Sequence, residues 1–139
     1  MFKKRKEGFT LVELLIVLAV IAALLAIITP VAVNAVKKAK ATQVASTLRN
    51  IAAAVQQFYY TEQMWPENGL ETLEASGYIQ GNIKDYELRP SNADTDTTTE
   101  GSVVYKGGTV DFSDVQKLWN EVKQSGNIIY VDIEVSKYW

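Results

Sequence analysis

Residues 3–28 read KKRKEGFTLVELLIVLAVIAALLAII, and they decide the fold of the chain. Four positive charges, Lys3 to Lys6, precede a segment from Phe9 to Val36 in which 28 residues carry one charge, Glu13. The remaining charges lie almost all downstream. A spanning helix needs about 20 mostly apolar residues, so this segment is long enough to cross a membrane. The sequence therefore predicts a membrane-directed N-terminus joined to a polar body.

Basic residues before an apolar run have three interpretations. A secretory signal peptide would be cut after a small-residue site, which Val33-Asn34-Ala35 loosely provides. A plain signal anchor would stay in the bilayer as a helix. A prepilin leader would be cut on the cytoplasmic side, before the apolar run begins.

Glu13 helps to separate these interpretations. A carboxylate inside a membrane segment costs free energy and usually has a function, which neither a signal peptide nor a simple anchor provides. A local explanation also exists, because Thr10-Leu11-Val12-Glu13 fits the S/T-x-x-E capping box that starts a helix. Both interpretations of Glu13 stay open on the residues alone.

The stretch from Lys3 to Leu14 closely resembles the prepilin signature of type IV pilins and pseudopilins. The resemblance implies that a membrane peptidase cuts between Gly8 and Phe9 and that Phe9 is then N-methylated. It also implies that Glu13 meets the Phe9 ammonium of a neighbouring subunit and sets the register of assembly. Two charges buried in a water-poor helix bundle need each other as partners, which agrees with this pairing.

One long helix is expected from Phe9 to about Tyr60. No glycine occurs between Phe9 and Asn68, and from Lys37 onward a single apolar stripe recurs at helical spacing, formed by Val44, Leu48, Ile51, Val55 and Phe58. The first half of this helix is apolar all round, and the second half is expected to pack one face on a sheet. Residues 63–139 alone would form a small core, so the helix supplies the missing layer.

Pro30 is the one proline of this helix, and it removes a backbone hydrogen bond. A simple kink is one interpretation. The resemblance implies another, in which Pro30 marks a helix break and Ala22–Thr29 unwinds in the assembled filament.

Turn residues in the body of the chain predict several short helices and strands. Leu70–Gly77 is expected to be a short helix closed by Gly77, Ile83–Arg89 a strand, and Ser102–Lys106 with Thr109–Phe112 a hairpin around Gly107-Gly108. A helix is expected after a capping box of Ser113 and Gln116, ending at Gly126. Asn127–Ser136 alternates apolar and polar residues and predicts a final strand.

Composition excludes several kinds of chemistry. The 139 residues include no cysteine and no histidine, which removes disulfides, thiolate metal sites and serine–histidine or cysteine–histidine catalysis. Asn92, Asp94 and Asp96 alternate in the loop Ser91–Glu100, but an EF-hand would need glycine at 97 and glutamate at 103, where the chain has Thr97 and Val103. A solvated loop is the prediction there, without metal or cofactor. No basic stripe predicts direct nucleic-acid binding.

The sequence thus predicts an α+β, pilin-like fold, with a long N-terminal helix packed by its C-terminal half on a small antiparallel sheet, plus short accessory helices. Four parts are expected: a leader (1–8), a transmembrane and polymerisation helix (9–36), its amphipathic continuation (37–62) and a globular head (63–139). No enzymatic activity is predicted. Without the leader, the side-chain charge changes from −2 to −5, because Lys and Arg fall from 14 to 10 and Asp and Glu from 16 to 15.

The predicted function is that of a structural subunit of a type IV pilus-like filament. Its alternative within the family is a pseudopilin of a type II secretion or DNA-uptake system, and outside the family a secreted or anchored binding domain with an ordinary signal segment. The resemblance implies as partners further copies of the chain, minor pilins, a prepilin peptidase/methylase, and a membrane platform with its ATPase. Before assembly the chain would cross the cytoplasmic membrane once with its N-terminus inside; afterwards it would lie in an extracellular or periplasmic filament.

Overall fold

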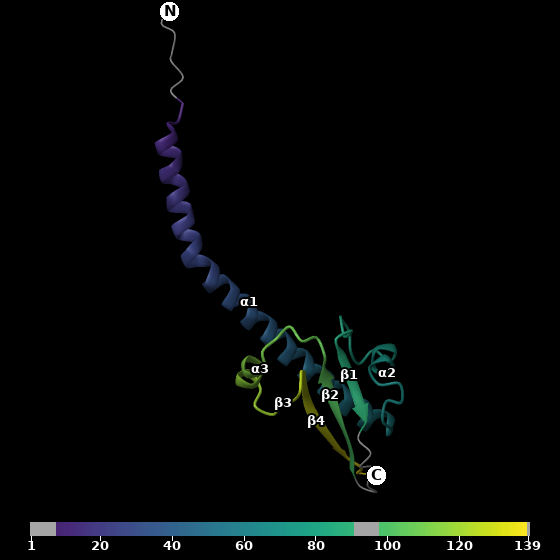
Figure 1. Cartoon of the computed structure of the whole chain (residues 1–139). Coiled ribbons are helices and arrows are strands. Elements are labelled where there is room, and N and C mark those ends of the chain that lie inside the picture. The colour runs from purple at the N-terminus through teal and green to yellow at the C-terminus, as the bar shows by residue number, and fades with distance from the viewer. Residues whose placement is uncertain (1–7, 91–97, 139) are drawn as a thin grey trace, which may run out of the picture. The chain divides into compact units, whose positions relative to one another are not determined.

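The computed structural model describes residues 8–90 and 98–138 (Figure 1). The predicted leader residues 1–7 and the loop residues Asn92, Asp94 and Asp96 lie outside this part of the chain. The contacts divide the protein into two units, one up to Lys37 and one from Lys38 onward. The elements, in chain order, are α1 (Leu11–Glu62), α2 (Leu70–Ala75), β1 (Tyr86–Pro90), β2 (Thr98–Tyr105), α3 (Phe112–Leu118), β3 (Lys123–Ser125) and β4 (Ile128–Ser136).

Helix α1 is continuous over 52 residues and contains Pro30. It begins at Leu11 and ends at Glu62, within two residues of the predicted limits at both ends. Residues Ala22–Thr29 are helical in this isolated chain, so unwinding at Pro30 stays a prediction for the assembled state. Gln63, with φ of 57°, takes the left-handed conformation directly after the helix, and its N–H donates to the Tyr59 carbonyl at 2.9 Å.

The four strands form one antiparallel sheet in the order β1-β2-β4-β3. Strand β4 alternates as predicted, because Ile129, Val131, Ile133 and Val135 are buried while Asp132 and Glu134 are exposed. Strand β2 contributes Val103 and Tyr105 to the same core cluster. The α+β prediction is therefore confirmed: a long helix combined with a small antiparallel sheet.

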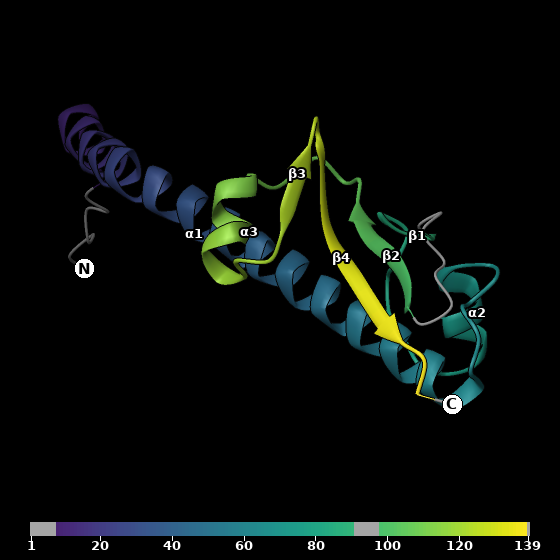
Figure 2. The ribbon, with the colours of Figure 1, turned by 90° about the horizontal axis from the view of Figure 1, so that it is seen from below.

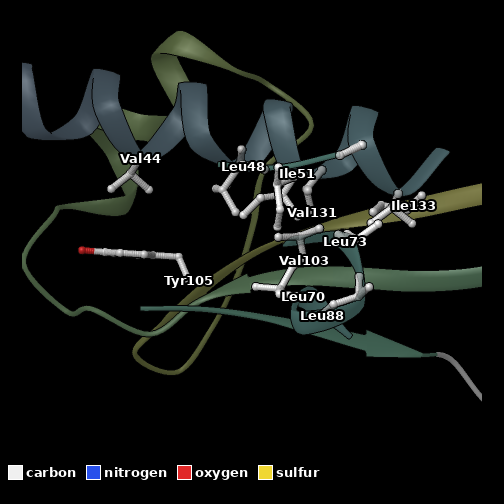
Figure 3. Packing of buried hydrophobic residues seen from close by; sticks show 14 of the residues in the cluster. Val44, Leu48, Ile51, Leu70, Leu73, Leu88, Val103, Tyr105, Val131 and Ile133 are labelled. Atoms are coloured by element: carbon white, nitrogen blue, oxygen red, sulfur yellow. The ribbon is translucent and has the colours of Figure 1, made fainter. Parts of the chain in front are cut away.

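The C-terminal half of α1 covers one face of this sheet (Figure 2). All five residues of the predicted stripe are buried, and Ala41, Ala45, Ala54 and Tyr59 extend it. Figure 3 shows Val44, Leu48 and Ile51 extending from the helix toward Val103 and Val131 of the strands. Leu70 and Leu73 of α2 close the core beside Leu88 of β1.

Helix α2 ends at Ala75, and Gly77 closes its C-terminus as predicted. The Gly77 N–H donates to the Glu74 carbonyl at 3.0 Å, and the Tyr78 N–H donates to the Leu73 carbonyl at 2.9 Å. Gly77 has a φ of 76°, so these two bonds form a Schellman motif around a residue in the left-handed conformation. Leu73 and Leu70 are thereby held against the core.

The hairpin predicted around Gly107-Gly108 is wrong. Strand β2 pairs along one edge with β1 and along the other with β4, so neither edge is open to Thr109–Phe112. That segment instead leads into α3 from Phe112 onward. Gly107 passes the Tyr105 ring so closely that a Cβ would overlap it, and the Tyr105 and Thr109 hydroxyls are 2.9 Å apart.

The helix predicted from Ser113 to Gly126 is also wrong in its cap and its length. Asp111 precedes α3 in extended conformation with no side-chain capping bond, and the helix stops at Leu118 because Trp119 is extended. Gly126, with φ of 60°, lies in the turn between β3 and β4 and does not end a helix. Strand pairing of Lys123–Ser125 with Ile128–Tyr130 therefore replaces the predicted last helical turns.

Strand β1 begins at Tyr86, three residues later than predicted. The Asn82 side chain accepts a hydrogen bond from the Lys84 N–H at 3.3 Å, and the Tyr86 N–H donates to the Ile83 carbonyl at 2.9 Å. These bonds form a turn, so the backbone enters the sheet only afterwards.

Gly101 in β2 is a position with no room for a side chain. A Cβ there would overlap the Trp65 indole and would lie 2.9 Å from the Arg89 carbonyl oxygen. We expect Gly101→Ala to lower the free energy of unfolding by about 1–3 kcal/mol, the usual range for overpacking. Urea denaturation of the full chain in detergent measures this, with Ser102→Ala on the same strand as the control. Equal stability of the two variants would contradict the close packing of Trp65.

Candidate functional site

The first 26 residues of α1, Leu11 to Val36, are all exposed. Within α1 an 18-residue window reaches a mean hydropathy of 3.2 with none of it buried, so by length and composition this helix can cross a membrane. Phe9, just before it, is 92% exposed. A soluble monomer rarely exposes so large a contiguous apolar surface, which marks the segment as an interaction surface. The large apolar side chains exposed here are Leu11, Val12, Leu14, Leu15, Ile16, Val17, Leu18, Val20, Ile21, Leu24, Leu25, Ile27, Ile28, Val31, Val33 and Val36.

A complete capping box starts α1. The Thr10 N–H donates to Oε2 of Glu13 at 2.8 Å, and the Glu13 N–H donates to Oγ1 of Thr10 at 3.2 Å. Two of the N–H groups that lack partners at a helix start are therefore satisfied. The carboxylate also lies in the first turn, where the helix dipole favours negative charge. The local interpretation of Glu13 is thus realised in the isolated chain.

The capping box fixes the Glu13 carboxylate but uses only one of its two oxygens. One carboxylate oxygen, Oε2, accepts the bond from Thr10, and within the described residues no hydrogen bond to Oε1 is present. Glu13 is exposed, as are Gly8, Phe9 and Pro30. The structure brings Thr10 and Glu13 together, while Pro30 lies almost five helical turns further along α1. The roles suggested for Gly8, Phe9, Glu13 and Pro30 stay predictions.

Charged side chains of the sheet form pairs on its outer face. Glu87 of β1 pairs with Lys106 and with Arg89, the latter at 3.2 Å, and these hydrogen bonds hold the pKa of the Glu87 carboxyl below its usual value. Lys123 of β3 donates to Asp132 of β4 at 2.6 Å, which raises the pKa of the lysine. These exposed pairs contribute little to stability. Among residues 8–90 and 98–138, no group of three or more Asp and Glu is placed to hold a metal ion.

Arg49 has a role that the sequence did not reveal. Its guanidinium donates to the Leu118 carbonyl at 2.8 Å and lies 5.1 Å from the centre of the Trp119 ring. A cation here satisfies a terminal carbonyl of α3 and stacks on an aromatic face. Arg49 lies off the apolar stripe, so its partners become apparent only once α3 is known to end at Leu118.

Comparison with known families finds one match at the N-terminus. Residues 3–29 match the prokaryotic N-terminal methylation motif. No curated protein and no solved structure matches the chain significantly. The match includes the capping box and most of the exposed apolar segment, and the chain therefore carries a type IV prepilin-like signature.

The capping box predicts a local effect of Thr10 on the helix start. Thr10→Val removes the oxygen that accepts from Glu13, and capping oxygens contribute about 1 kcal/mol. We expect amide hydrogen exchange at Glu13 and Leu14, whose N–H groups donate to Thr10, to become several times faster in the detergent-solubilised chain. Thr42→Val is the matched control, because the Thr42 hydroxyl donates to the Lys38 carbonyl within the same helix at 2.9 Å. Unchanged exchange in Thr10→Val would show that the capping box does not hold the helix start.

Proposed function

Because the chain carries a type IV prepilin-like signature, we propose that it is a structural subunit that polymerises through its N-terminal helix into a type IV pilus-like filament. The observation that carries this proposal is the exposed apolar surface from Leu11 to Val36, whose one charge is Glu13. Such a surface must be covered by lipid before assembly and by other copies of the same helix afterwards. The protein acts by assembly and has no catalytic role.

The four parts expected from the sequence have separate tasks in this proposal. The leader (1–8) is removed, residues 9–36 anchor the subunit and then polymerise, residues 37–62 support the head, and residues 63–139 face the outside. Cleavage between Gly8 and Phe9 removes the four positive charges of the leader and leaves one ammonium at Phe9. N-methylation of Phe9 keeps that charge. Pro30 gives the helix a weak point at which Ala22–Thr29 can unwind when a filament is stretched.

Glu13 sets the register between subunits in this proposal. In a bundle of apolar helices a buried carboxylate needs a cation, and the Phe9 ammonium of a neighbouring copy is the nearest charge of that kind in the mature segment. The capping box supports this role, because it fixes the carboxylate in the first turn while Oε1 stays available. A misplaced subunit would leave both charges unpaired.

The partners and location follow from the same proposal. A prepilin peptidase/methylase processes the chain, and a membrane platform with its ATPase adds it to a filament with minor pilins and further copies of itself. The subunit crosses the membrane once, with its N-terminus in the cytoplasm, before assembly. Afterwards it lies in an extracellular or periplasmic filament. A short filament needed for secretion or DNA uptake would instead indicate a pseudopilin.

Processing is tested by the intact mass of the protein isolated from membranes. We expect a chain that begins at N-methylated Phe9, without residues 1–8. Gly8→Val should leave the leader attached, because the peptidase requires a residue without a side chain before the cut. Gly101→Ala, a glycine substitution in the head, should still be cut. A wild-type chain that keeps its leader, or begins near Lys37, would contradict the proposal and favour an anchored or secreted binding domain.

The role of the Glu13 charge in assembly is tested by removing that charge. We expect Glu13→Gln to be cut normally, because the capping oxygen remains, yet to yield at least tenfold fewer filaments in sheared and sedimented fractions. Glu62→Gln, an exposed carboxylate at the other end of α1, is the matched control and should assemble like the wild type. Filaments at wild-type levels in Glu13→Gln would show that Glu13 does not set the register.

A further inference from the structure

Three lysines form a band where α1 passes from its exposed apolar part to its packed part. Lys37, Lys38 and Lys40 follow Val36 directly and precede Ala41, the first buried residue of the helix. We refer to these three lysines as the basic collar. All are exposed, and none forms an ion pair with any residue of 8–90 or 98–138.

The charge of the collar contrasts with the rest of the body. From Ala41 to the C-terminus the chain has 7 Lys and Arg against 14 Asp and Glu, a net charge of −7. Several cations of the head, among them Lys106, Lys117 and Lys123, are paired with carboxylates. The collar is therefore a local concentration of unpaired positive charge on an otherwise acidic body.

The position of the collar corresponds to the headgroup layer of a bilayer. Phe9–Val36 contains 28 residues, which span about 42 Å as a helix. A bilayer is about 30 Å thick in its hydrocarbon core and about 40–45 Å with its polar layers. If Phe9 lies at one surface, Lys37 begins where the opposite phosphates lie. Positive residues on the translocated side run against the usual charge bias of membrane proteins.

Helix α3 adds to this surface within the head. A groove of about 340 Å³ is lined by Lys38, Ala41 and Thr42 of α1 and by Asp114, Lys117 and Leu118 of α3. Lys117 is 3.5 Å from Asp114, which offsets part of its charge, whereas Lys38 has no such partner in the described chain. Leu118 is 45% exposed and offers an apolar contact beside the lysines.

We propose that the basic collar binds the phosphates of anionic phospholipids in the leaflet on the head side of the membrane. The proposal rests on the membrane insertion included in the proposed function, and it adds a lipid partner for the subunit before assembly. Each lysine near an anionic surface strengthens association about fivefold. The contact holds the head at the surface, and leaving the membrane for a filament requires its release.

Lipid preference of the full mature chain in nanodiscs tests this proposal. The probes are dansyl-phosphatidylglycerol and dansyl-phosphatidylcholine, excited by energy transfer from the tryptophans at equal mole fraction. We expect the wild type to prefer phosphatidylglycerol severalfold at 50 mM NaCl and to lose that preference at 0.5 M NaCl, because salt screens exposed charges. Lys38→Gln/Lys40→Gln should lose most of this preference, so that the two lipids bind almost equally at 50 mM NaCl.

The control removes the same charge elsewhere. Lys84 and Lys137 are exposed and lie far from the collar in the sequence, so Lys84→Gln/Lys137→Gln should keep the preference. Equal loss in both double variants would overturn the proposal, since net charge would then account for it. No preference in the wild type would also overturn it. If the collar variant keeps its lipid preference but forms fewer filaments than the wild type, the partner is another subunit. Failure of filament formation by the wild type would contradict only the proposed function.

Discussion

Packing of the α1 stripe on the inner face of the sheet is the interaction on which the head depends. In the described chain the other helices add only Leu70, Leu73 and Val115 to the core as buried residues. Burial of one large apolar side chain contributes about 2 kcal/mol, so the loss of only two or three stripe contacts would cost about 4–6 kcal/mol. Whole domains are stable by about 5–15 kcal/mol. The head therefore cannot be separated from the helix that also provides the exposed apolar segment.

This constraint explains which parts of the fold could be predicted from the sequence. Apolar residues recur about every 3.6 residues on α1 and at every second residue on β4. Both repeats can be recognised from the residue types alone. The stripe from Val44 to Phe58 and the alternation from Ile129 to Val135 were therefore predicted correctly. The end of α2 was also predictable, because Gly77 adopts a conformation that other residues rarely take.

The errors concern segments whose structure depends on distant partners. Gly107-Gly108 has the local chemistry of a hairpin, but both edges of β2 are already paired by β1 and β4. The region after Leu118 has apolar residues at helical spacing, yet pairing of β3 with β4 favours an extended chain there. Arg49 is a third case, because its partner is a carbonyl exposed by the early end of α3. In the first two cases strand pairing decided the outcome, and in the third the end of α3 did; no local sequence pattern contains either.

At the N-terminus, by contrast, the local interpretation and the assembly interpretation of Glu13 are compatible. The Thr10 N–H donates to one carboxylate oxygen, and a helix start favours a negative charge there, so Glu13 is stabilised in the first turn of α1. One neutral N–H donor does not compensate a carboxylate that is buried in a water-poor bundle. Burial of this end of the helix would therefore require a cation as a partner for Glu13. The capping box therefore stabilises the Glu13 carboxylate in the single chain. It would leave the charge of that carboxylate without a partner if helices packed around it. In the proposed assembly, the Phe9 ammonium of a neighbouring copy would remove that deficit only at the correct axial position, so a residue that starts a helix would also be suited to fix its register.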